Sequence, residues 1–376
     1  MKTFKELGLN DYIINCLNNN EITDPKEIQE LAIEHILQGK DLIGMSHTGS
    51  GKTLAFVCPI VQSLDITKRQ TQALILAPTH ELVMQTSAVV KMFASDEMPI
   101  TSLAVIGDVN IEKQIKKIKE TKPHIIIGTP GRVLDLIKKK KITAHTLNTI
   151  VIDEGDNLLD NTNTQAVKDI VKSAMRDTQL LIFSATMTGK ALNNANSFMK
   201  DPVMVGAEGK ATLNPNIEHM YIEVDNRDKA ERVRKLISAV DPDKALVFVN
   251  KGMEVDLVTE KLNFHNIPAL SIHKKISKED RQKAMDSIRS GKIKVLVSSD
   301  VSARGLDIPD ITHVINLDFP RDSGEYLHRA GRTARGNKGG CTISLVTERE
   351  KAAIRIYERE FKIEIAEKKL SHGKLQ

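Results

Sequence analysis

The sequence predicts an α/β protein of two domains, each a mostly parallel β-sheet with helices on both faces. Short apolar runs rich in β-branched residues alternate with stretches of helical period, as in parallel strands joined by helices. The length of 376 residues exceeds what one ordinary core needs. Small residues interrupt the alternation once, so we expect domains at 1–205 and 215–376, joined by a short hinge at 206–214.

Each apolar run is expected to form one strand. The predicted strands are Ala73–Ala77, His124–Gly128, Thr149–Ile152, Leu180–Phe183, Ala245–Val249, Ala269–His273, Lys294–Ser298, His313–Leu317 and Cys341–Val346. Helical period is found at Ile111–Lys119, Asp280–Ile288 and Glu348–Arg359. The remaining residues, Lys362–Gln376, are expected to be a short polar tail.

Composition and charge narrow the class of protein. Hydrophobic residues make up 40% and charged residues 27% of the chain, and no apolar run approaches membrane length. The first residues lack the apolar core of a signal peptide, and Cys16, Cys58 and Cys341 form no metal-binding spacing. We therefore expect a cytoplasmic protein. The net charge of +5 favours a polyanionic partner but does not by itself establish nucleic-acid binding.

A phosphate-binding loop is predicted at Ser46–Thr53, between an apolar run and a helix-like stretch. It departs from the strict pattern only at its first residue, where glycine is usual. Gly49 and Gly51 would let backbone N–H groups wrap phosphates beside a helix N-terminus. Lys52 would reach the β- and γ-phosphates, and the Thr53 hydroxyl would ligate Mg²⁺. An ordinary glycine-rich turn is the alternative.

An acidic motif follows the strand predicted at Thr149–Ile152, where the chain continues as Asp153-Glu154-Gly155-Asp156. Asp153 at such a strand end could hold Mg²⁺. Glu154 could orient or deprotonate an attacking water. A functionless acidic turn is common in α/β proteins, but the phosphate loop upstream favours the catalytic interpretation.

Three arginines in eight residues mark a third element, His328–Arg335. A guanidinium stays charged and matches phosphate oxygens with a planar fork of donors. Because this loop belongs to the other predicted domain, it is typical of an arginine finger supplied within one chain. A solvated basic loop is the alternative. The active site would then be complete only when the domains close.

Taken in order, the motifs resemble those of DEAD-box RNA helicases of helicase superfamily 2 across nearly the whole chain. The matching segments are Gln29 with Pro25 and Phe4, Ser46–Thr53, Pro78–Leu82, Thr129–Arg132, Asp153–Asp156, Ser184–Thr186, Val247–Asn250, Ser299–Asp300, Arg304–Asp307 and His328–Arg335. The resemblance implies two RecA-like domains, ATP and Mg²⁺ as cofactors, RNA as partner and a monomer. It implies an RNA-dependent ATPase that locally unwinds short duplexes.

The resemblance also assigns roles to single residues. The catalytic residues are Lys52, Asp153, Glu154, Arg332 and Arg335, and the metal ligands are Thr53 and Asp153. Nucleotide contacts fall on Phe4, Gln29, Ser46, Thr48, Gly49, Ser50, Gly51, Lys52, Thr53 and Asp307. Asp156, Ser184, Thr186 and His328 couple hydrolysis to strand separation, and Arg329 receives no role. RNA contacts fall on Pro78, Thr79, Thr129, Gly131, Arg132, Arg281 and Ser299.

Within this scheme Gln29 reads the adenine edge and Phe4 packs on the adenine face. A surface glutamine and a core phenylalanine are the alternatives. The RNA contacts are of types that bind phosphates without reading bases. Aromatic residues make up only 3% of the chain, so platforms for base stacking are scarce and sequence-independent binding is expected.

Several residues depart from the family's pattern. Gly155 stands where alanine is usual, His80 where arginine is usual, and Asp108, Lys274, Lys278, Lys26 and Ile22 are further departures. The ATP machinery is nearly intact, whereas the RNA surface is altered. An ATP-gated RNA clamp or assembly factor with little unwinding therefore stays open as a second function. Lys138–Lys141 is the densest basic run, interpreted first as an exposed helix end, with an RNA patch as the alternative.

Overall fold

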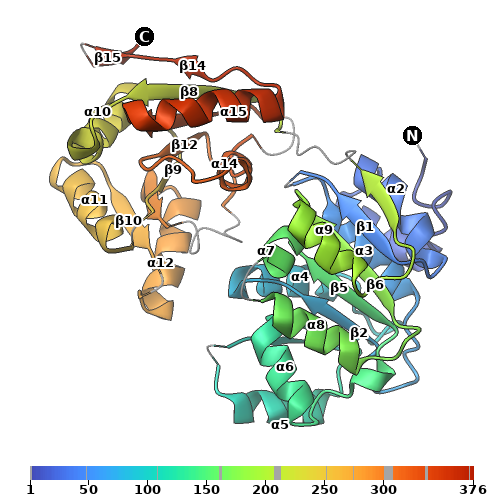
Figure 1. Cartoon of the computed structure of the whole chain (residues 1–376). Helices are drawn as coiled ribbons and strands as arrows, with labels where there is room; N and C mark the ends of the chain where they lie inside the picture. The colour runs from blue at the N-terminus through green and yellow to red at the C-terminus, as the bar shows by residue number, and fades with distance from the viewer. Residues whose placement is uncertain are drawn as a thin grey trace. The chain divides into compact units, whose positions relative to one another are not determined.

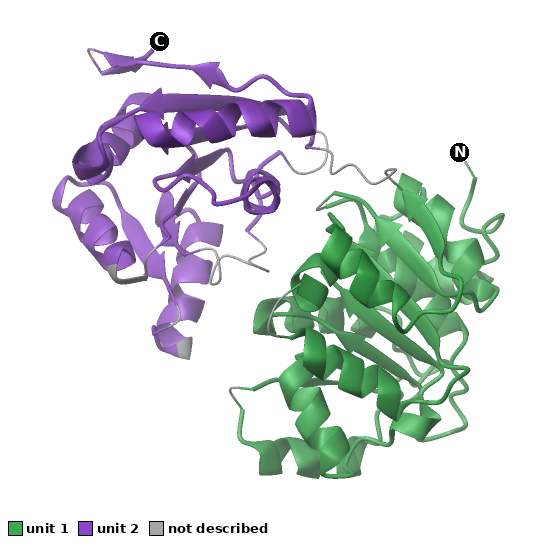
Figure 2. Cartoon of the chain, in the orientation of Figure 1, with its two compact units in different colours: residues 1–209 green, residues 210–376 purple. Residues whose placement is uncertain are grey.

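The computed structural model divides into two compact units, residues 1–209 and 210–376 (Figure 1 and Figure 2). The structure describes all residues except Met1, Thr48, Asp108, 161–162, 207–212, Lys251, Lys274, 300–307, 335–337 and His372. Each unit contains one seven-stranded sheet, and all described pairings within these two sheets are parallel. The predicted α/β fold with two parallel sheets is confirmed.

The sheet of the first unit has the order β3-β4-β2-β5-β6-β1-β7. Its strands are β1 (Leu42–Met45), β2 (Ala73–Leu76), β3 (Ser102–Val105), β4 (Ile125–Gly128), β5 (Thr149–Asp153), β6 (Gln179–Ser184) and β7 (Val203–Gly206). Its helices are α1 (Asp11–Asn18), α2 (Glu27–Leu37), α3 (Lys52–Gln62), α4 (His80–Lys91), α5 (Ile111–Thr121), α6 (Pro130–Lys138), α7 (Gly155–Asp160), α8 (Thr164–Ser173) and α9 (Gly189–Asn196), with a 3-10 turn η1 at Ala144–Thr146.

Alternating residues of these strands feed two hydrophobic cores, one on each face of the sheet. Helices α1 to α4 pack on one face, where Ile75 and Phe56 belong to the same cluster. Helices α5 to α9 pack on the other, where Leu74 and Val133 share a cluster. Because both faces are covered, the strands are mostly apolar, as parallel strands usually are.

The second unit repeats this plan with the order β10-β11-β9-β12-β13-β8-β14. Its strands are β8 (Ile217–Glu223), β9 (Ala245–Phe248), β10 (Ala269–Ile272), β11 (Val295–Ser298), β12 (His313–Asn316), β13 (Gly340–Val346) and β14 (Ala366–Glu367). The helices with described bounds are α10 (Lys229–Val240), α11 (Gly252–Phe264), α12 (Lys278–Arg289), α14 (Ser323–Ala330) and α15 (Lys351–Phe361), with 3-10 turns η2 (Asn226–Asp228) and η3 (Glu348–Glu350).

Every predicted strand is present, with ends within one residue of those expected. The prediction of a polar tail at Lys362–Gln376, however, is wrong. It contributes β14, which pairs with β8 at the sheet edge, and a hairpin of β15 (Leu370–Ser371) and β16 (Lys374–Leu375). Leu370 and Leu375 pack against the core of the second unit. A two-residue strand has no periodicity of its own, so the sequence could not show this pairing.

The first residue of the predicted hinge is part of the first sheet. Gly206 is the last residue of β7 and pairs with Met45. Its φ is +95°, and a Cβ would lie 1.9 Å from the Met45 carbonyl oxygen, so the strand can end here only with glycine. At the other end of the predicted hinge, Asn214 donates a hydrogen bond to the Ala334 carbonyl of the second unit, at 2.6 Å. Residues 207–212 lie outside the described residues.

Candidate nucleotide site and arginine loop

The phosphate loop joins β1 to α3 at the carboxyl edge of the first sheet. Gly49 and Gly51 have φ of +85° and +93°, a region that favours glycine. A Cβ on Gly49 would meet nothing within 4 Å, whereas a Cβ on Gly51 would lie 2.5 Å from Gln29 Nε2. The loop therefore has free space beside Gly49, whereas the Gln29 side chain packs against it at Gly51. Thr48 lies outside the described residues.

Lys52 is 8% exposed, and its ammonium donates to the Ser46 and His47 carbonyls at 2.7 and 3.2 Å. This holds the charge beneath the loop. The Ser50 hydroxyl is buried and has no hydrogen-bond partner among the described residues. A buried polar atom without a partner costs free energy. A ligand that accepts a hydrogen bond at Ser50, as a phosphate oxygen does, would remove that cost.

Gln29 supports the loop from behind. It is 1% exposed, which excludes the alternative of a surface glutamine. Its Nε2 donates to the Gly51 carbonyl at 3.0 Å, and its Oε1 accepts from the Lys26 N–H at 2.9 Å. Lys26 in turn donates from Nζ to the Gly49 carbonyl at 3.3 Å. A second ammonium therefore lies beside the loop, at a position noted in the sequence only as a departure from the family.

Phe4 lies in the hydrophobic core. Its side chain is 3% exposed and belongs to the core cluster that also contains Leu7 and Ile28. This burial favours the alternative of a core phenylalanine, and the packing of Phe4 on adenine stays a prediction.

The acidic motif begins at the last residue of β5. Asp153 is 5% exposed. Burial, and then the neighbouring Glu154 carboxylate, raise the pKa of Asp153 to about 7, although the Lys52 ammonium acts in the opposite direction. A divalent cation would stabilise the ionised form of this carboxyl. The Asp153 carboxyl therefore fits a bound Mg²⁺. Thr53, the other predicted ligand, is half-buried in the first turn of α3, and its role stays a prediction.

Gly155 begins α7 directly after this carboxylate pair. A Cβ at Gly155 would lie 2.5 Å from Cγ2 of Ile182 on β6. The methyl group of an alanine would thus overlap a branched side chain close to its backbone. The glycine at this position of the motif is explained by the bulk of Ile182.

Strand β6 links the acidic motif to the phosphate loop, because it lies between β5 and β1. Ser184 accepts at Oγ from the Asp156 N–H at 3.0 Å, and its carbonyl accepts from the Ser46 N–H at 3.0 Å. Thr186 Oγ1 donates to the Asp156 carboxylate at 2.8 Å. A shift of the phosphate loop would therefore be transmitted to Asp156 through the C-terminal end of β6. The predicted coupling role of these residues stays a prediction.

The candidate RNA contacts of the first unit lie at the N-termini of two helices. Thr79 caps α4, and its Oγ1 accepts from the Leu82 N–H at 3.3 Å. Thr129 is the N-cap residue of α6. These helices follow β2 and β4, which are paired strands, so their positive ends share one edge. Pro78 precedes Thr79, and a Cβ on Gly131 would meet no neighbouring atom within 4 Å.

Arg132, a predicted RNA contact, forms hydrogen bonds within the first unit. Its guanidinium donates from Nη1 to the Val109 carbonyl at 2.7 Å and from Nη2 to the Gly107 carbonyl. The side chain therefore anchors the turn before α5. In the second unit Arg281 lies on α12 and Ser299 follows β11; both are half-buried.

The arginine loop of the second unit lies at the end of α14. Arg332 is 7% exposed and donates from Nε to the His328 carbonyl at 3.2 Å. It also lines a pocket of about 590 Å³ together with Lys244 and Lys338. Arg335 and Asp307, the other two residues predicted to contact nucleotide in this unit, lie outside the described residues.

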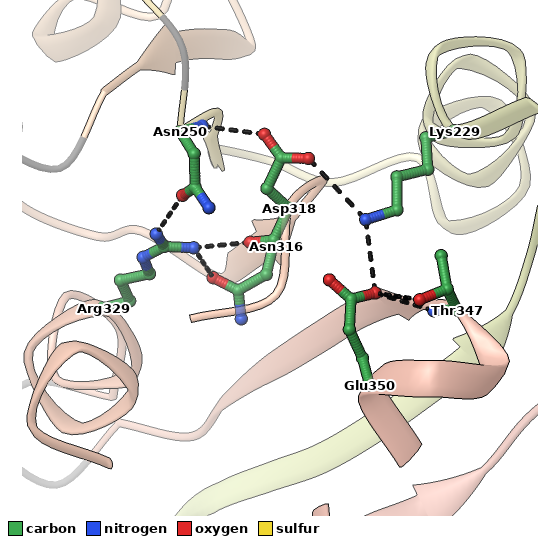
Figure 3. Close-up of polar contacts among 7 residues, drawn as sticks. All are labelled: Lys229, Asn250, Asn316, Asp318, Arg329, Thr347 and Glu350. Atoms are coloured by element: carbon green, nitrogen blue, oxygen red, sulfur yellow. Dashed lines mark hydrogen bonds and ion pairs between the residues drawn. The ribbon is translucent and has the colours of Figure 1, made fainter. Parts of the chain in front are cut away.

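Arg329 is the residue that the sequence reasoning missed. It is 1% exposed and donates to Asn250 Oδ1 at 2.7 Å, to the Asp318 carbonyl at 2.7 Å and to Asn316 Oδ1 at 3.2 Å (Figure 3). Its guanidinium also lies 5.0 Å from the centre of the Phe248 ring, within reach of a cation–π interaction. The sequence did contain a signal for this burial. Tyr326 and Ala330 lie at helical spacing on the face of α14 that packs inward, and this face includes Arg329.

The network extends from Arg329 across the second unit (Figure 3). Asp318 accepts from the Asn250 N–H at 2.8 Å and lies 3.6 Å from the Lys229 ammonium. Lys229 is also 3.5 Å from Glu350, which accepts from the N–H and the hydroxyl of Thr347 at 2.8 and 2.7 Å. These contacts tie the start of the arginine loop to three strand ends.

Comparison with known proteins agrees with this arrangement. Residues 26–195 match the DEAD/DEAH box helicase family, and residues 228–337 match the helicase conserved C-terminal domain. The chain is 39% identical to a Bacillus cereus protein named DEAD-box ATP-dependent RNA helicase CshC, covering 92% of this chain and 88% of that protein. It is 37% identical to the probable ATP-dependent RNA helicase YfmL of Bacillus subtilis, covering 96% and 94%.

Solved structures show the same fold. The structure of S. cerevisiae Dbp5 bound to RNA and ADP BeF3 superposes with a TM-score of 0.89 at 28% identity, covering 98% of this chain and 95% of that one. Within the described residues, no helix has both the length and the apolarity required to cross a membrane.

Proposed function

Because the chain belongs to the DEAD-box helicase family, we propose that it is an RNA-dependent ATPase that binds RNA independently of sequence and locally unwinds short duplexes. The observation that carries this proposal is the phosphate loop, where the Lys52 ammonium is fixed beneath an open Gly49 and beside the unpartnered Ser50 hydroxyl. We further propose that the protein acts as a cytoplasmic monomer.

The nucleotide half of the proposal assigns each residue a step. Lys52 and the loop N–H groups bind the β- and γ-phosphates, and Gln29 is the candidate contact to the adenine edge. Thr53 and Asp153 would hold Mg²⁺, which supplies charge neutralisation between the phosphates. Glu154 orients the attacking water and accepts its proton. Arg332 and Arg335 stabilise the charge on the γ-phosphate in the transition state.

The RNA half assigns backbone contacts to Pro78, Thr79, Thr129 and Gly131 of the first unit and to Arg281 and Ser299 of the second. N–H groups and hydroxyls at helix N-termini bind phosphates without reading bases. Ser184, Thr186, Asp156 and His328 are proposed to couple nucleotide state to RNA binding. The bonds between Ser184, Thr186 and Asp156 support the part of this coupling that lies in the first unit.

One observation favours the second candidate, an ATP-gated RNA clamp with weak unwinding. The Arg132 guanidinium already donates to two carbonyls, so binding a phosphate would require it to leave them. Together with His80 in place of an arginine, this predicts weaker engagement of the strand than is usual for the family.

The test measures ATP turnover with and without single-stranded RNA, and separation of a short duplex with and without ATP. We expect RNA to raise turnover and ATP to be required for strand separation. Turnover that ignores RNA would contradict both candidates. Turnover that responds to RNA without any strand separation would select the clamp. Equal affinity for poly-A and poly-U, falling with salt at a log–log slope of about −0.7 per phosphate contact, is expected for sequence-independent binding.

A further inference from the structure

The first unit has an excess of positive over negative charge in one segment only. Residues 111–141 contain ten Lys and Arg side chains and three Asp and Glu side chains. The rest of residues 1–209 contains 13 basic and 21 acidic side chains. A unit that is otherwise acidic thus has one strongly basic segment, and this segregation gives that surface a positive potential of its own.

This segment folds into one surface, which we call the lysine patch. It consists of Lys113, Lys116, Lys117, Lys119 and Lys122 on and after α5, and of Lys138–Lys141 at the end of α6. All nine side chains are exposed. On α5, Ile111, Ile115 and Ile118 face the core, and Lys113, Lys116 and Lys117 occupy the opposite face at helical spacing.

The two helices pack on the same face of the first sheet. Ile115 and Ile118 of α5 belong to the same hydrophobic cluster as Val133 and Leu136 of α6, and Figure 1 labels both helices at the lower end of the first unit. The helices flank β4, which pairs in parallel with β3, so both run in the same direction. Their C-terminal ends, with Lys122 and Lys138–Lys141, therefore lie at the same edge of the sheet.

The lysines of the patch are largely without ion pairs. Among the described residues only Lys116 has a partner, Glu120, at 3.9 Å, which is an exposed pair of little energetic weight. Some of these lysines stabilise helix C-termini through the helix dipole, but that accounts for the last turns and not for the outer face of α5. Unpaired like charges this close together repel one another, and a polyanion would relieve the repulsion.

We propose that the lysine patch binds the RNA backbone as a second site, continuous with the contact at the start of α6. This proposal rests on the proposed function, which places Thr129 and Gly131 against RNA. Helix α6 runs from Pro130 to Lys138, a rise of about 12 Å, so one helix leads from the first contact to the patch. RNA that extends beyond the contact at Thr129 and Gly131 would follow α6 and α5 and lie over their ammonium groups.

The chemistry of the patch predicts how it binds. No aromatic residue occurs between residues 111 and 141, so bases would have no ring on which to stack. Binding would therefore depend on phosphate charge alone and would be strongly sensitive to salt. The patch would lengthen the stretch of RNA that the protein holds, and it would play no part in the hydrolysis of ATP.

The experiment compares two single-stranded RNAs on the full-length protein: a short one that just suffices to stimulate ATP turnover, and one several times longer. The patch variants are Lys139→Gln/Lys141→Gln and Lys116→Gln/Lys117→Gln. The matched control is Lys40→Gln/Lys91→Gln, which removes two exposed lysines of the same unit outside the patch. Dissociation constants are measured at two salt concentrations that differ fourfold.

For the wild type, the longer RNA should bind more tightly than the short one. Each patch variant should lose this gain and reduce the steepness of the log–log salt slope by about 1.4, which over a fourfold change in salt is about sevenfold in affinity. Short-RNA affinity and maximal ATP turnover should stay at the wild-type values, which also shows that the variants are folded.

Two outcomes would overturn the inference without touching the proposed function. In the first, short RNA stimulates ATP turnover, but the wild type binds the longer RNA no more tightly than the short one. The same conclusion follows if the patch variants gain as much affinity from the added length as the control does. In the second, the patch variants lose binding to poly-glutamate but bind the longer RNA as tightly as the wild type does. This would assign the patch to an acidic protein partner. Failure of short RNA to stimulate turnover at all would instead contradict the proposed function.

Discussion

The phosphate loop of the first unit and the Arg329 network of the second are both rich in charged and polar side chains, yet they differ in how completely these are satisfied. At the loop, the Ser50 hydroxyl is buried without a partner and burial raises the pKa of Asp153. In the network, the Arg329 guanidinium reaches three oxygen acceptors and an aromatic ring. The first region leaves a buried hydroxyl that a ligand could satisfy, whereas the second satisfies its guanidinium with groups of the chain itself.

The two arginines at the start of the arginine loop are expected to have different roles. Arg329 and Arg332 lie three residues apart, and both are almost fully buried. The side chain of Arg329 is held among strand ends of its own unit, so it fixes the helix that presents the loop. Arg332 is the candidate for the γ-phosphate. We therefore expect substitutions at the phosphate loop to change chemistry and substitutions in the network to change stability.

The largest effect is expected for Lys52→Ala, Glu154→Gln and Arg332→Ala, measured as ATP turnover at saturating RNA. Removing an arginine that meets the γ-phosphate typically costs about 10³-fold or more in rate, and we expect losses of that order for each variant. Glu154→Gln should still bind ATP, because the amide keeps the shape and loses only the basic function. Lys91→Ala, an exposed lysine of the same unit, is the control. Near wild-type turnover in any one variant would remove that residue from the mechanism.

Arg329→Met tests the other side of the comparison. Removing one member of a buried charged network leaves its partners unsatisfied and costs about 3–5 kcal/mol. The readout is denaturant unfolding followed by tyrosine fluorescence, since Tyr221, Tyr326 and Tyr357 of the four tyrosines lie in the second unit. Arg321→Met, at an exposed arginine, should cost little. Unchanged stability together with lost ATP turnover would mean that Arg329 acts on the nucleotide after all.

A fall in pH should lower the free energy of unfolding of the second unit, because His219 is buried there. Burial lowers the pKa of His219 to about 4, and its Nδ1 lies 2.8 Å from the Tyr326 hydroxyl. Because the unfolded chain binds the proton near pH 6.5, stability is lost as pH falls from 6.5 toward 4, by about 3 kcal/mol in full.

The measurement is the unfolding free energy of the second unit at pH 7.5 and pH 4.5. His219→Asn should flatten the difference, and His265→Asn, at an exposed histidine, should not. An equal pH dependence in all three proteins would exclude His219 as its source.

The smallest effect is expected at Lys26, whose ammonium reaches the Gly49 carbonyl. An exposed cation beside a phosphate contributes up to about 1 kcal/mol, so Lys26→Thr should weaken ATP binding by a few-fold and leave maximal turnover unchanged. Lys40→Thr is the matched control. Tighter ATP binding in the Lys26 variant would show that this side chain instead competes with phosphate for the loop.

The strands and the loop motifs could be predicted because their signals are local. Runs such as Ala73–Leu76 are apolar on both faces, and a glycine loop between strand and helix is a contiguous pattern. What the sequence could not show depends on distant contacts. The burial of Phe4 is decided by the side chains around it, and the acceptors of Arg329 come from two segments that are more than 60 residues apart, at Asn250 and at Asn316 with Asp318.

Gly155 shows the same limit within one motif. The sequence shows Gly155 only as a departure from the family, whereas the reason for the glycine is Ile182 on the neighbouring strand. Residues of a motif can be recognised one by one, but the side chains that oppose them across the sheet cannot.

The C-terminal segment has a consequence for how the protein behaves in solution. Strand β14 covers part of the outer edge of β8, and the Lys368 N–H donates to the Tyr221 carbonyl at 2.8 Å. Without residues 362–376, the seven-residue strand β8 would present a row of unpaired backbone groups, a template on which a second molecule can add a strand. Truncation there should therefore produce concentration-dependent oligomers and precipitation on storage, well before any loss of catalytic power is detected.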